Sequence, residues 1–412
     1  MRARLRTVIF GLVLLGFLWL GVGHGPALAL TDEQNLVAEV WRIVNRAYLD
    51  ETFNHQNWWF IRQRALKQSL NDRDTTYTTI QGMLAALEDP YTRLLRPEQY
   101  RSLQTSTSGE LTGVGLQITK GEADNVLSVI APIEGSPAEQ AGIQPKDRVL
   151  KIEGTVTQQL SLDEAANRMR GPAGTKVTLT LERNDTSGPF EVTLVRDRIT
   201  LNPVSADLRA TPDGLKVGYL RLGQFNANAS SELSAAIKRL EGAGADAYIL
   251  DLRNNPGGLL QAGIEIARLW LDQGTIVYTV SRQGILDSFE AHGPALTQDP
   301  LVVLVNEGTA SASEILAGAL QDNGRAQLVG TVTFGKGLIQ SLFDLSDGAG
   351  LAVTVAKYET PDHHDINRLG ITPDRVVEVK PLGRETFGTE QDPQYQAALE
   401  LLSNPAVIAG VS

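Results

Sequence analysis

The sequence contains no cysteine, and basic residues are scarce relative to acidic ones. Without cysteine, the 412-residue chain can have neither a thiol nucleophile nor a disulfide. Its formal net charge of −11 argues against binding to nucleic acid and gives no reason to expect adhesion to anionic lipid. Length and composition, which is ordinary for a globular protein, predict two or three domains, each with its own core.

An apolar run of 15 residues occupies positions 8–22, which is short for a membrane span. Three arginines precede it, and an Ala-x-Ala cleavage pattern follows at positions 27–29. Residues 1–29 are therefore predicted to be a secretory signal peptide. An uncleaved N-terminal anchor is the alternative, and both interpretations place the remainder of the chain outside the cytoplasm.

The most informative stretch runs from Leu301 to Gln340. The apolar residues 301–305 predict a buried strand, and the spacing of residues 315–320 predicts a helix that packs on a sheet. The small-residue corner between them contains Ser311. Such a corner can expose a nucleophile at the end of a strand, while the free N–H groups of the following first turn point at a docked group.

Each of these residues also has an ordinary interpretation. Ser311-x-x-Glu314 before an apolar run is a capping box, and Lys336 between two glycines is typical of an exposed loop. The spacing before Lys336 resembles a phosphate-binding P-loop, but Gly337 replaces the Ser or Thr that would bind magnesium. Residues 338–343 moreover predict a strand where a P-loop would begin a helix. We therefore reject nucleotide binding.

Taken together, Thr309-Ala-Ser311-Ala-Ser-Glu-Ile315, Thr333-Phe-Gly-Lys336-Gly and Gln340 resemble the carboxyl-terminal processing peptidases, or tail-specific proteases. Lys336 follows Ser311 by 25 positions and Gln340 follows Lys336 by 4, which selects Ser311 over Ser313. The resemblance implies a serine nucleophile, a lysine base and an orienting glutamine. It also implies oxyanion donors at the backbone of Ala312 and of Gly257, which lies 54 residues before Ser311.

The residue types suit this chemistry. A serine hydroxyl is a poor nucleophile until a base takes its proton. Lysine acts as that base only when its pKa falls well below about 10.4, which burial away from carboxylates achieves. Gln340 can orient the amine without raising its pKa as a glutamate would. Relatives often carry three glycines where this chain has Pro256-Gly257-Gly258, but the implied N–H donor is Gly257, so the oxyanion hole should survive.

Residues 30–105 are predicted to form a helical N-terminal domain, because Leu36, Val40, Ile43, Val44 and Ala47 share one helix face. The run from Val40 to Tyr48, with Phe53-Asn54 and Trp58, resembles the N-terminal segment of the photosynthetic branch of the family. Those enzymes trim the precursor of a photosystem II reaction-centre protein in the thylakoid lumen. The resemblance thus implies a membrane-embedded substrate and a luminal or periplasmic location.

Residues 106–197 predict a β-rich domain whose segment order resembles a circularly arranged PDZ domain. The resemblance identifies Gly113-Val114-Gly115-Leu116 as the loop that binds a terminal carboxylate. PDZ domains bind extended chain ends by adding a strand to a sheet edge, so the expected partners are proteins with exposed C-terminal tails. Arg170 aligns with an arginine thought to couple tail binding to activation in related proteases, although an exposed turn charge is an equal alternative.

Residues 198–412 alternate strand and helix patterns, which indicates an α/β core. Strands are expected at 217–222 and 247–252 and helices at 231–240 and from Leu259. A C-terminal helix at 395–402 is expected to pack on the N-terminal helices. By resemblance, the whole is a multidomain α/β protein: a helical N-terminal region, a PDZ domain and a crotonase-like serine–lysine protease core.

The function expected from the sequence is a serine endopeptidase that cleaves near the C-terminus of its substrates and needs no metal or organic cofactor. His363-His364-Asp365 offers an alternative metal site or His–Asp pair, but no further ligands at metal-binding spacing are evident. Two other functions remain open. One is a periplasmic or luminal tail-specific protease of broader specificity. The other is a PDZ peptide-binding module with a vestigial dyad, which the intact set of catalytic residues argues against.

Overall fold

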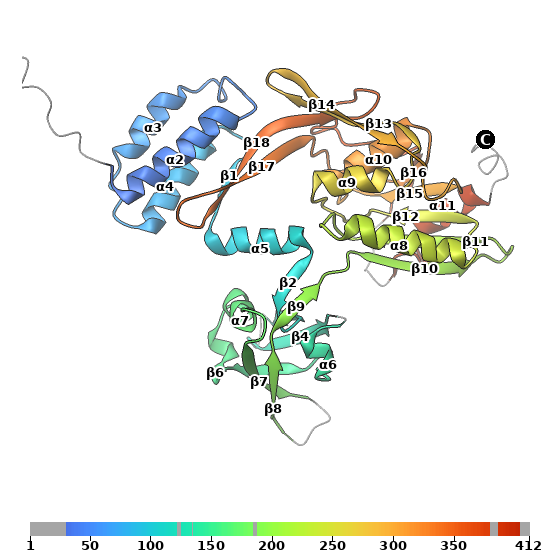
Figure 1. The fold of residues 1–412 in the computed structure, drawn as a ribbon, viewed down its shortest axis with the longest axis horizontal. Helices are drawn as coiled ribbons and strands as arrows, with labels where there is room; N and C mark the ends of the chain where they lie inside the picture. The colour runs from blue at the N-terminus through green and yellow to red at the C-terminus, as the bar shows by residue number, and fades with distance from the viewer. Residues whose placement is uncertain (1–29, 122–124, 134, 184–187, 380–385, 404–412) are drawn as a thin grey trace, which may run out of the picture. The chain divides into compact units, whose positions relative to one another are not determined.

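The computed structural model describes residues 30–121, 125–133, 135–183, 188–379 and 386–403 (Figure 1). The predicted signal peptide lies outside the described residues. No helix in the described ranges is both long and apolar enough to cross a membrane. The chain divides into two compact units, one containing residues up to Leu94 with Leu342–Val353, and the other Leu95–Ser341 with the chain from Thr354 onward.

The first unit contains the helices α2 (Asp32–Ala47), α3 (Trp58–Leu66) and α4 (Arg73–Ala85), which pack on one another (Figure 1). A capping box between Thr31 and Gln34 starts α2. A hairpin tip from the distant segment 342–353 belongs to the same unit, where Asp347 accepts a 2.7 Å hydrogen bond from the Tyr77 hydroxyl. The sequence predicted the helices but not this added hairpin.

Helix α5 (Pro97–Ser108) continues three residues past the expected boundary at 105 and leads into the β-rich domain that the sequence predicted to be PDZ-like. This domain has its own apolar core and a sheet in the order β3-β4-β5-β7-β8, with β6 beside β5. Strands β2 and β9 form a separate two-stranded ladder. The remaining bounds are β2 Glu110–Gly113, β3 Leu116–Lys120, β4 Leu127–Pro132, α6 Pro137–Gln140, β5 Arg148–Ile152, β6 Thr155–Val156, a 3₁₀ turn at Thr157–Gln159, α7 Leu162–Met169, β7 Lys176–Glu182, β8 Phe190–Val195 and β9 Asp197–Thr200.

The core of the second unit is a six-stranded sheet in the order β10-β11-β12-β15-β16-β19. All neighbouring pairs are parallel except β10–β11, so β11 to β19 end at the same edge of the sheet. The bounds are β10 Val204–Ala210, β11 Lys216–Leu222, β12 Ala247–Asp251, β15 Leu301–Val305, β16 Gln327–Gly330 and β19 Arg375–Val376.

Helices cover both faces of this sheet. Alternate strand residues, such as Leu250 and Val303, pack with the helices α8 (Ala229–Gly242), α9 (Leu260–Ala267) and α10 (Ala312–Asp322). The intervening residues, such as Ile249 and Val302, pack with α11 (Pro393–Leu402). Both faces are therefore apolar, as expected for parallel strands. The C-terminal helix thus packs on the core sheet, and the expectation that it packs on the N-terminal helices is corrected.

A second sheet has the strand order β1-β18-β13-β14, with β17 beside β18. Its strands are β1 Arg93–Leu95, β13 Gln273–Ser281, β14 Gly284–His292, β17 Leu338–Asp344 and β18 Gly350–Glu359. Strand β17 follows the glycine-flanked lysine, as the sequence predicted. Because β17 is anchored by pairing with β18, the lysine loop is held between two ordered segments.

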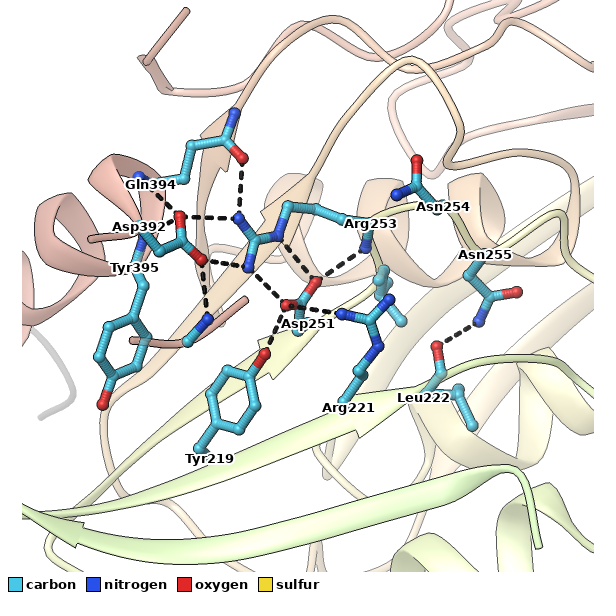
Figure 2. Close-up of polar contacts among 12 residues, drawn as sticks. Tyr219, Arg221, Leu222, Asp251, Arg253, Asn254, Asn255, Asp392, Gln394 and Tyr395 are labelled. Carbon is cyan, nitrogen blue, oxygen red and sulfur yellow. Dashed lines mark hydrogen bonds and ion pairs between the residues drawn. The ribbon is translucent and has the colours of Figure 1, made fainter. Parts of the chain in front are cut away.

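A buried ionic network joins the end of β12 to the start of α11 (Figure 2). The Arg253 guanidinium donates to Asp251 at 2.6 Å and to Asp392 at 2.7 Å, and all three side chains are almost fully buried. Asp251 also accepts a hydrogen bond from the Tyr219 hydroxyl. Burial alone would raise the pKa of Asp392, but hydrogen bonds and charge from Arg253 hold it below its usual range.

Replacing Asp392 by asparagine should therefore destabilise the core. Because the variant breaks a buried pair, we expect a loss of about 3 kcal/mol in the free energy of unfolding at neutral pH. A lowered carboxylate pKa adds stability above the unfolded pKa of about 3.9 and loses it as pH falls below that value. The difference between wild type and variant, measured by urea unfolding across this range, should shrink in acid. The exposed variant Asp207→Asn is the control, and equal stability of Asp392→Asn and wild type would contradict the assignment.

Candidate active site

Ser311 occupies a sharp corner between β15 and α10. Its backbone has φ 59° and ψ −119°, an unusual conformation for a residue other than glycine. Such a conformation costs about 1–3 kcal/mol and persists only when its surroundings impose it. Strained strand-to-helix corners of this kind expose the nucleophile in many hydrolases. The hydroxyl-bearing residue is half-buried, so it is neither fully packed away nor loosely exposed.

Gly257 lies directly against this corner. It follows β12, which pairs with β15, and a Cβ added to it would lie 2.8 Å from Ser311 Cβ and 2.9 Å from the Ala312 nitrogen. Its φ of 91° independently favours glycine. The sequence-predicted oxyanion residues Gly257 and Ala312 are thus next to each other and next to Ser311. The closeness, rather than the turn alone, explains why glycine is required.

The two backbone donors differ in their partners. Ala312 is the first residue of α10, and none of the hydrogen bonds among the described residues uses its N–H. The Gly257 N–H instead donates to the Asn255 side chain at 2.9 Å. One predicted donor is therefore open and the other has an internal acceptor, which the sequence did not reveal.

Asn255 connects three segments around the site. Its side-chain amide donates to Leu222 at the end of β11 while its side-chain oxygen accepts from Gly257. Its backbone carbonyl accepts from the Ala310 N–H and from the Ser313 hydroxyl, each at 3.0 Å. The residue is fully buried. It fixes the glycine turn relative to the serine corner, and an Asn two residues before a glycine was the available sequence signal for such a turn.

Lys336 lies in the loop that follows β16, the next parallel neighbour of β15. The loop is tied to the serine corner, because the Phe334 N–H donates to the Thr309 carbonyl at 3.0 Å. One carboxylate oxygen of Glu314 accepts the N–H groups of both Ser311 and Lys336 at 2.9 Å. The two backbone nitrogens are therefore no further apart than twice that distance. The fold brings the serine corner and the predicted lysine base together.

Gln340, the third predicted residue, lies in β17 and is half-buried. Its side-chain amide donates to the Thr354 hydroxyl on the paired strand β18 at 3.4 Å. The Tyr358 hydroxyl, on the same strand, donates to the Lys336 carbonyl. Strand β18 therefore supports both the lysine loop and the strand that carries Gln340.

The His363-His364-Asp365 segment has other contacts. The His363 ring stacks on Tyr278 and lies 3.1 Å from the Glu359 carboxylate, and Asp365 forms an ion pair with Lys357. Burial would lower the pKa of Lys357, but its hydrogen bonds to Glu359 and Asp365 raise it. In the part of the chain that the structure describes, no group of three or more potential ligand side chains is arranged to hold a metal. The segment has the contacts of a surface ionic cluster.

The PDZ domain brings the predicted tail-binding residues together. The loop from Gly113 to Leu116 joins β2 to β3, and a Cβ on Gly113 would lie 3.4 Å from the Arg170 Cα. Val114 is buried, and its carbonyl accepts from the Ala138 N–H. Strand β3 is at the end of its sheet, so its outer edge has no strand partner among the described strands. An extended peptide can pair with such an edge.

The fold and the serine corner are those of a peptidase with a PDZ domain. Residues 216–377 match the model of Peptidase family S41 and residues 128–183 match the PDZ domain model. The carboxyl-terminal-processing protease of Picosynechococcus sp. is 60% identical over 415 residues, covering 100% of this chain and 99% of the relative. The chain therefore belongs to peptidase family S41, among the carboxyl-terminal-processing proteases, and is a peptide hydrolase.

Two further similarities connect the chain with photosynthetic organisms. The chloroplastic carboxyl-terminal-processing peptidase 2 of Arabidopsis thaliana is 46% identical over 383 residues, covering 89% of this chain and 74% of the relative. A solved photosystem II D1 C-terminal processing protease superposes with a TM-score of 0.57 at 40% identity, covering 89% of this chain and 100% of that structure. The chain is thus close to the protease that processes D1.

The packing of Gly257 predicts that Gly257→Ala abolishes most activity. The added methyl group would lie 2.6 Å from the Ala310 carbonyl oxygen and would displace the serine corner. Misplacement of reacting groups by about 1 Å can cost about a hundredfold in kcat. The control is Gly242→Ala, where a Cβ meets nothing within 4 Å. Peptide cleavage assays on both folded variants test this, and a Gly257→Ala enzyme with normal kcat would contradict it.

Proposed function

We propose that the protein is a serine endopeptidase that uses Ser311 as nucleophile and Lys336 as general base, and that cleaves substrates near their free C-termini. In this mechanism the neutral Lys336 amine takes the Ser311 proton as the hydroxyl oxygen attacks the scissile carbonyl. Lys336 then donates that proton to the leaving amine. A water molecule, deprotonated by the same amine, hydrolyses the acyl-enzyme, and Ser311 regains its proton.

The strained corner at Ser311 is the observation that carries this proposal. Ser311 has φ 59° and follows a buried parallel strand. For a residue other than glycine this conformation costs free energy, and such strained residues cluster at active sites. Gly257 packs on Ser311, and the backbone of Lys336 is hydrogen-bonded to the same carboxylate as the Ser311 N–H. These contacts supply a nucleophile, backbone donors and a loop with a basic residue at one sheet edge, where ligands bind in parallel sheets.

On this proposal, the Ala312 and Gly257 N–H groups stabilise the oxyanion. The Ala312 N–H is directed by the start of α10, where the helix dipole also favours negative charge. The Gly257 N–H must be shared with, or released by, the Asn255 side chain. Hydrogen bonds to charged oxygens are roughly twice as strong as neutral ones, so the developing oxyanion competes well with the neutral amide oxygen.

We further propose that the substrate tail pairs with the edge of β3 and places its carboxylate at Gly113-Val114-Gly115-Leu116. The free edge of β3 and the closeness of Gly113 to Arg170 support this. Such pairing uses the backbone, so tails of different sequence can bind. Arg170 lies beside Gly113 of this loop, so on this proposal it links binding of the tail to activation.

The preferred substrate is the precursor of a photosystem II reaction-centre protein, a membrane-embedded protein with an exposed tail. The solved photosystem II D1 C-terminal processing protease and the chloroplastic Arabidopsis peptidase support this choice. The predicted N-terminal signal peptide supports an exported location, in the thylakoid lumen or the periplasm. A protease of broader specificity in the same compartment is the alternative, and a silent PDZ binding module is the less favoured one.

The dyad can be tested by cleavage of a synthetic peptide with a free apolar C-terminus. We expect Ser311→Ala and Lys336→Ala to be folded and to lose more than about a thousandfold in kcat, because the two residues act as a unit. Ser313→Ala is the comparison variant, because it removes the neighbouring serine hydroxyl, and it should lose far less activity than Ser311→Ala. It loses only a buried hydrogen bond to Asn255, worth about 1 kcal/mol of stability. Near-normal cleavage by Lys336→Ala would show that another group is the base.

Tail recognition can be tested with the same peptide carrying a C-terminal amide. Removal of the terminal charge should raise KM by about tenfold or more, since a charge-assisted hydrogen bond is worth about 1.5–3 kcal/mol. Arg170→Ala should reduce activity on the free tail, whereas the nearby exposed Arg168→Ala should not. Equal cleavage of acid and amide peptides would contradict recognition of the carboxylate.

A further inference from the structure

We propose that Glu314 is a positioning residue that fixes the serine corner and the lysine loop relative to each other. This inference rests on the function proposed above and adds a residue to its machinery. Glu314 is fully buried on the first turn of α10. Its carboxylate accepts four hydrogen bonds of 2.6–2.9 Å, one from the corner and three from the loop that contains Lys336.

The four donors are divided between the two oxygens. Oε1 accepts from the Thr333 hydroxyl at 2.6 Å and from the Gly335 N–H at 2.7 Å. Oε2 accepts from the N–H groups of Ser311 and Lys336, both at 2.9 Å. A helix-capping glutamate would need only the bond to Ser311. The three extra bonds reach a segment 19 to 22 residues further along the chain, so the side chain joins two separate elements.

The chemistry requires a carboxylate here. An ionised carboxylate only accepts hydrogen bonds and offers about four lone-pair sites, which match four converging donors. A glutamine has the same shape but would direct its NH₂ group at two of those donors. Each buried donor left without an acceptor costs about 1–3 kcal/mol. The substitution would therefore separate the corner and the loop or twist one of them.

The Ser311 N–H bond gives Glu314 a second role at the same point. Ser311 has a positive φ, which its own preference does not support. The Glu314 bond holds the N–H of Ser311 itself, and the bond of the Ala310 N–H to Asn255 holds the residue before it, so the strained backbone is fixed at two consecutive peptide groups. Because misplacement of reacting groups by about 1 Å can cost a hundredfold in rate, a tie between nucleophile and base segments acts mainly on kcat.

Thr333 provides an independent way to weaken the same tie. Its hydroxyl donates to Glu314 and accepts the Ile371 N–H at 2.7 Å. Thr333→Val keeps the shape but removes both the donor to Glu314 and the acceptor of the Ile371 N–H, whereas Thr333→Ser keeps the hydroxyl and both bonds. Neither substitution changes a group that would touch the substrate. Comparison of the two variants therefore distinguishes the effect of losing the hydroxyl hydrogen bonds from the effect of changed packing.

The test is steady-state cleavage of the free-tail peptide by the full mature chain, with thermal unfolding of each variant measured beside it. We expect Glu314→Gln to lower kcat by about a hundredfold with KM changed less than about twofold. Thr333→Val should lower kcat by about tenfold and Thr333→Ser should restore it. The double variant Glu314→Gln/Thr333→Val should be no slower than Glu314→Gln alone, because both remove the same tie.

The matched control is Asp392→Asn, another buried carboxylate that accepts backbone N–H groups in the same unit. It should lower the unfolding temperature as Glu314→Gln does but leave kcat near wild type. A normal kcat in Glu314→Gln or Thr333→Val, or an equal kcat loss in Asp392→Asn, would overturn the proposal. An active wild type with an inactive Ser311→Ala shows that the proposed function stands when the Glu314 role fails, whereas an inactive wild type overturns both.

Discussion

The parallel pairing of β12, β15 and β16 is the constraint on which the site depends. Parallel strands end at the same edge, so the segments that follow these three strands are brought together there. Those segments contain Gly257, Ser311 and Lys336, which are far apart in the sequence. Burial of both sheet faces under α8, α9, α10 and α11 fixes the register. A slip of one residue in β15 would exchange its two apolar faces and move the serine corner away from the glycine turn.

Buried carboxylates occur at two places next to this edge, and different groups interact with them at each place. Asp251 and Asp392 share the Arg253 guanidinium, and the pKa of Arg253 is raised because its paired carboxylates outweigh its burial (Figure 2). Glu314 is surrounded instead by N–H and hydroxyl dipoles. The first arrangement joins α11 to the sheet and is a matter of stability. The second joins two loops of the site, where oriented dipoles hold a carboxylate and set the positions of backbone groups at the same time.

The sequence predicted the elements around the site well, because apolar periodicity determines them. The expected strand at 301–305 is β15 with the same bounds, and the helix expected at 231–240 lies within α8. Gly257 was placed beside Ser311 by family spacing, and the structure gives the physical reason in its contact with the corner. The bounds of such strands and helices can be predicted from the sequence because they depend on residues that are close together along the chain.

The features that the sequence did not predict all depend on contacts between distant segments. Ser311-x-x-Glu314 predicted one capping bond, but nothing in the pattern indicates that Thr333, Gly335 and Lys336 return to the same carboxylate. The C-terminal helix has an apolar face that fits several partners, and only the folded sheet shows which one it covers. The addition of segment 342–353 to the N-terminal unit is likewise a tertiary contact.

The distribution of these contacts indicates which part of the proposed machinery is rigid. The serine corner is held at Thr309, Ala310, Ser311 and Ser313 by hydrogen bonds to the glycine turn, to the lysine loop and to Glu314. Strain at Ser311 is thus imposed from several sides, which is the condition under which it persists. Lys336 is fixed through its backbone, but its four-carbon side chain adds rotatable bonds between that backbone and the amine. On the proposed mechanism, control of activity through movement of the serine corner would have to break most of this network at once.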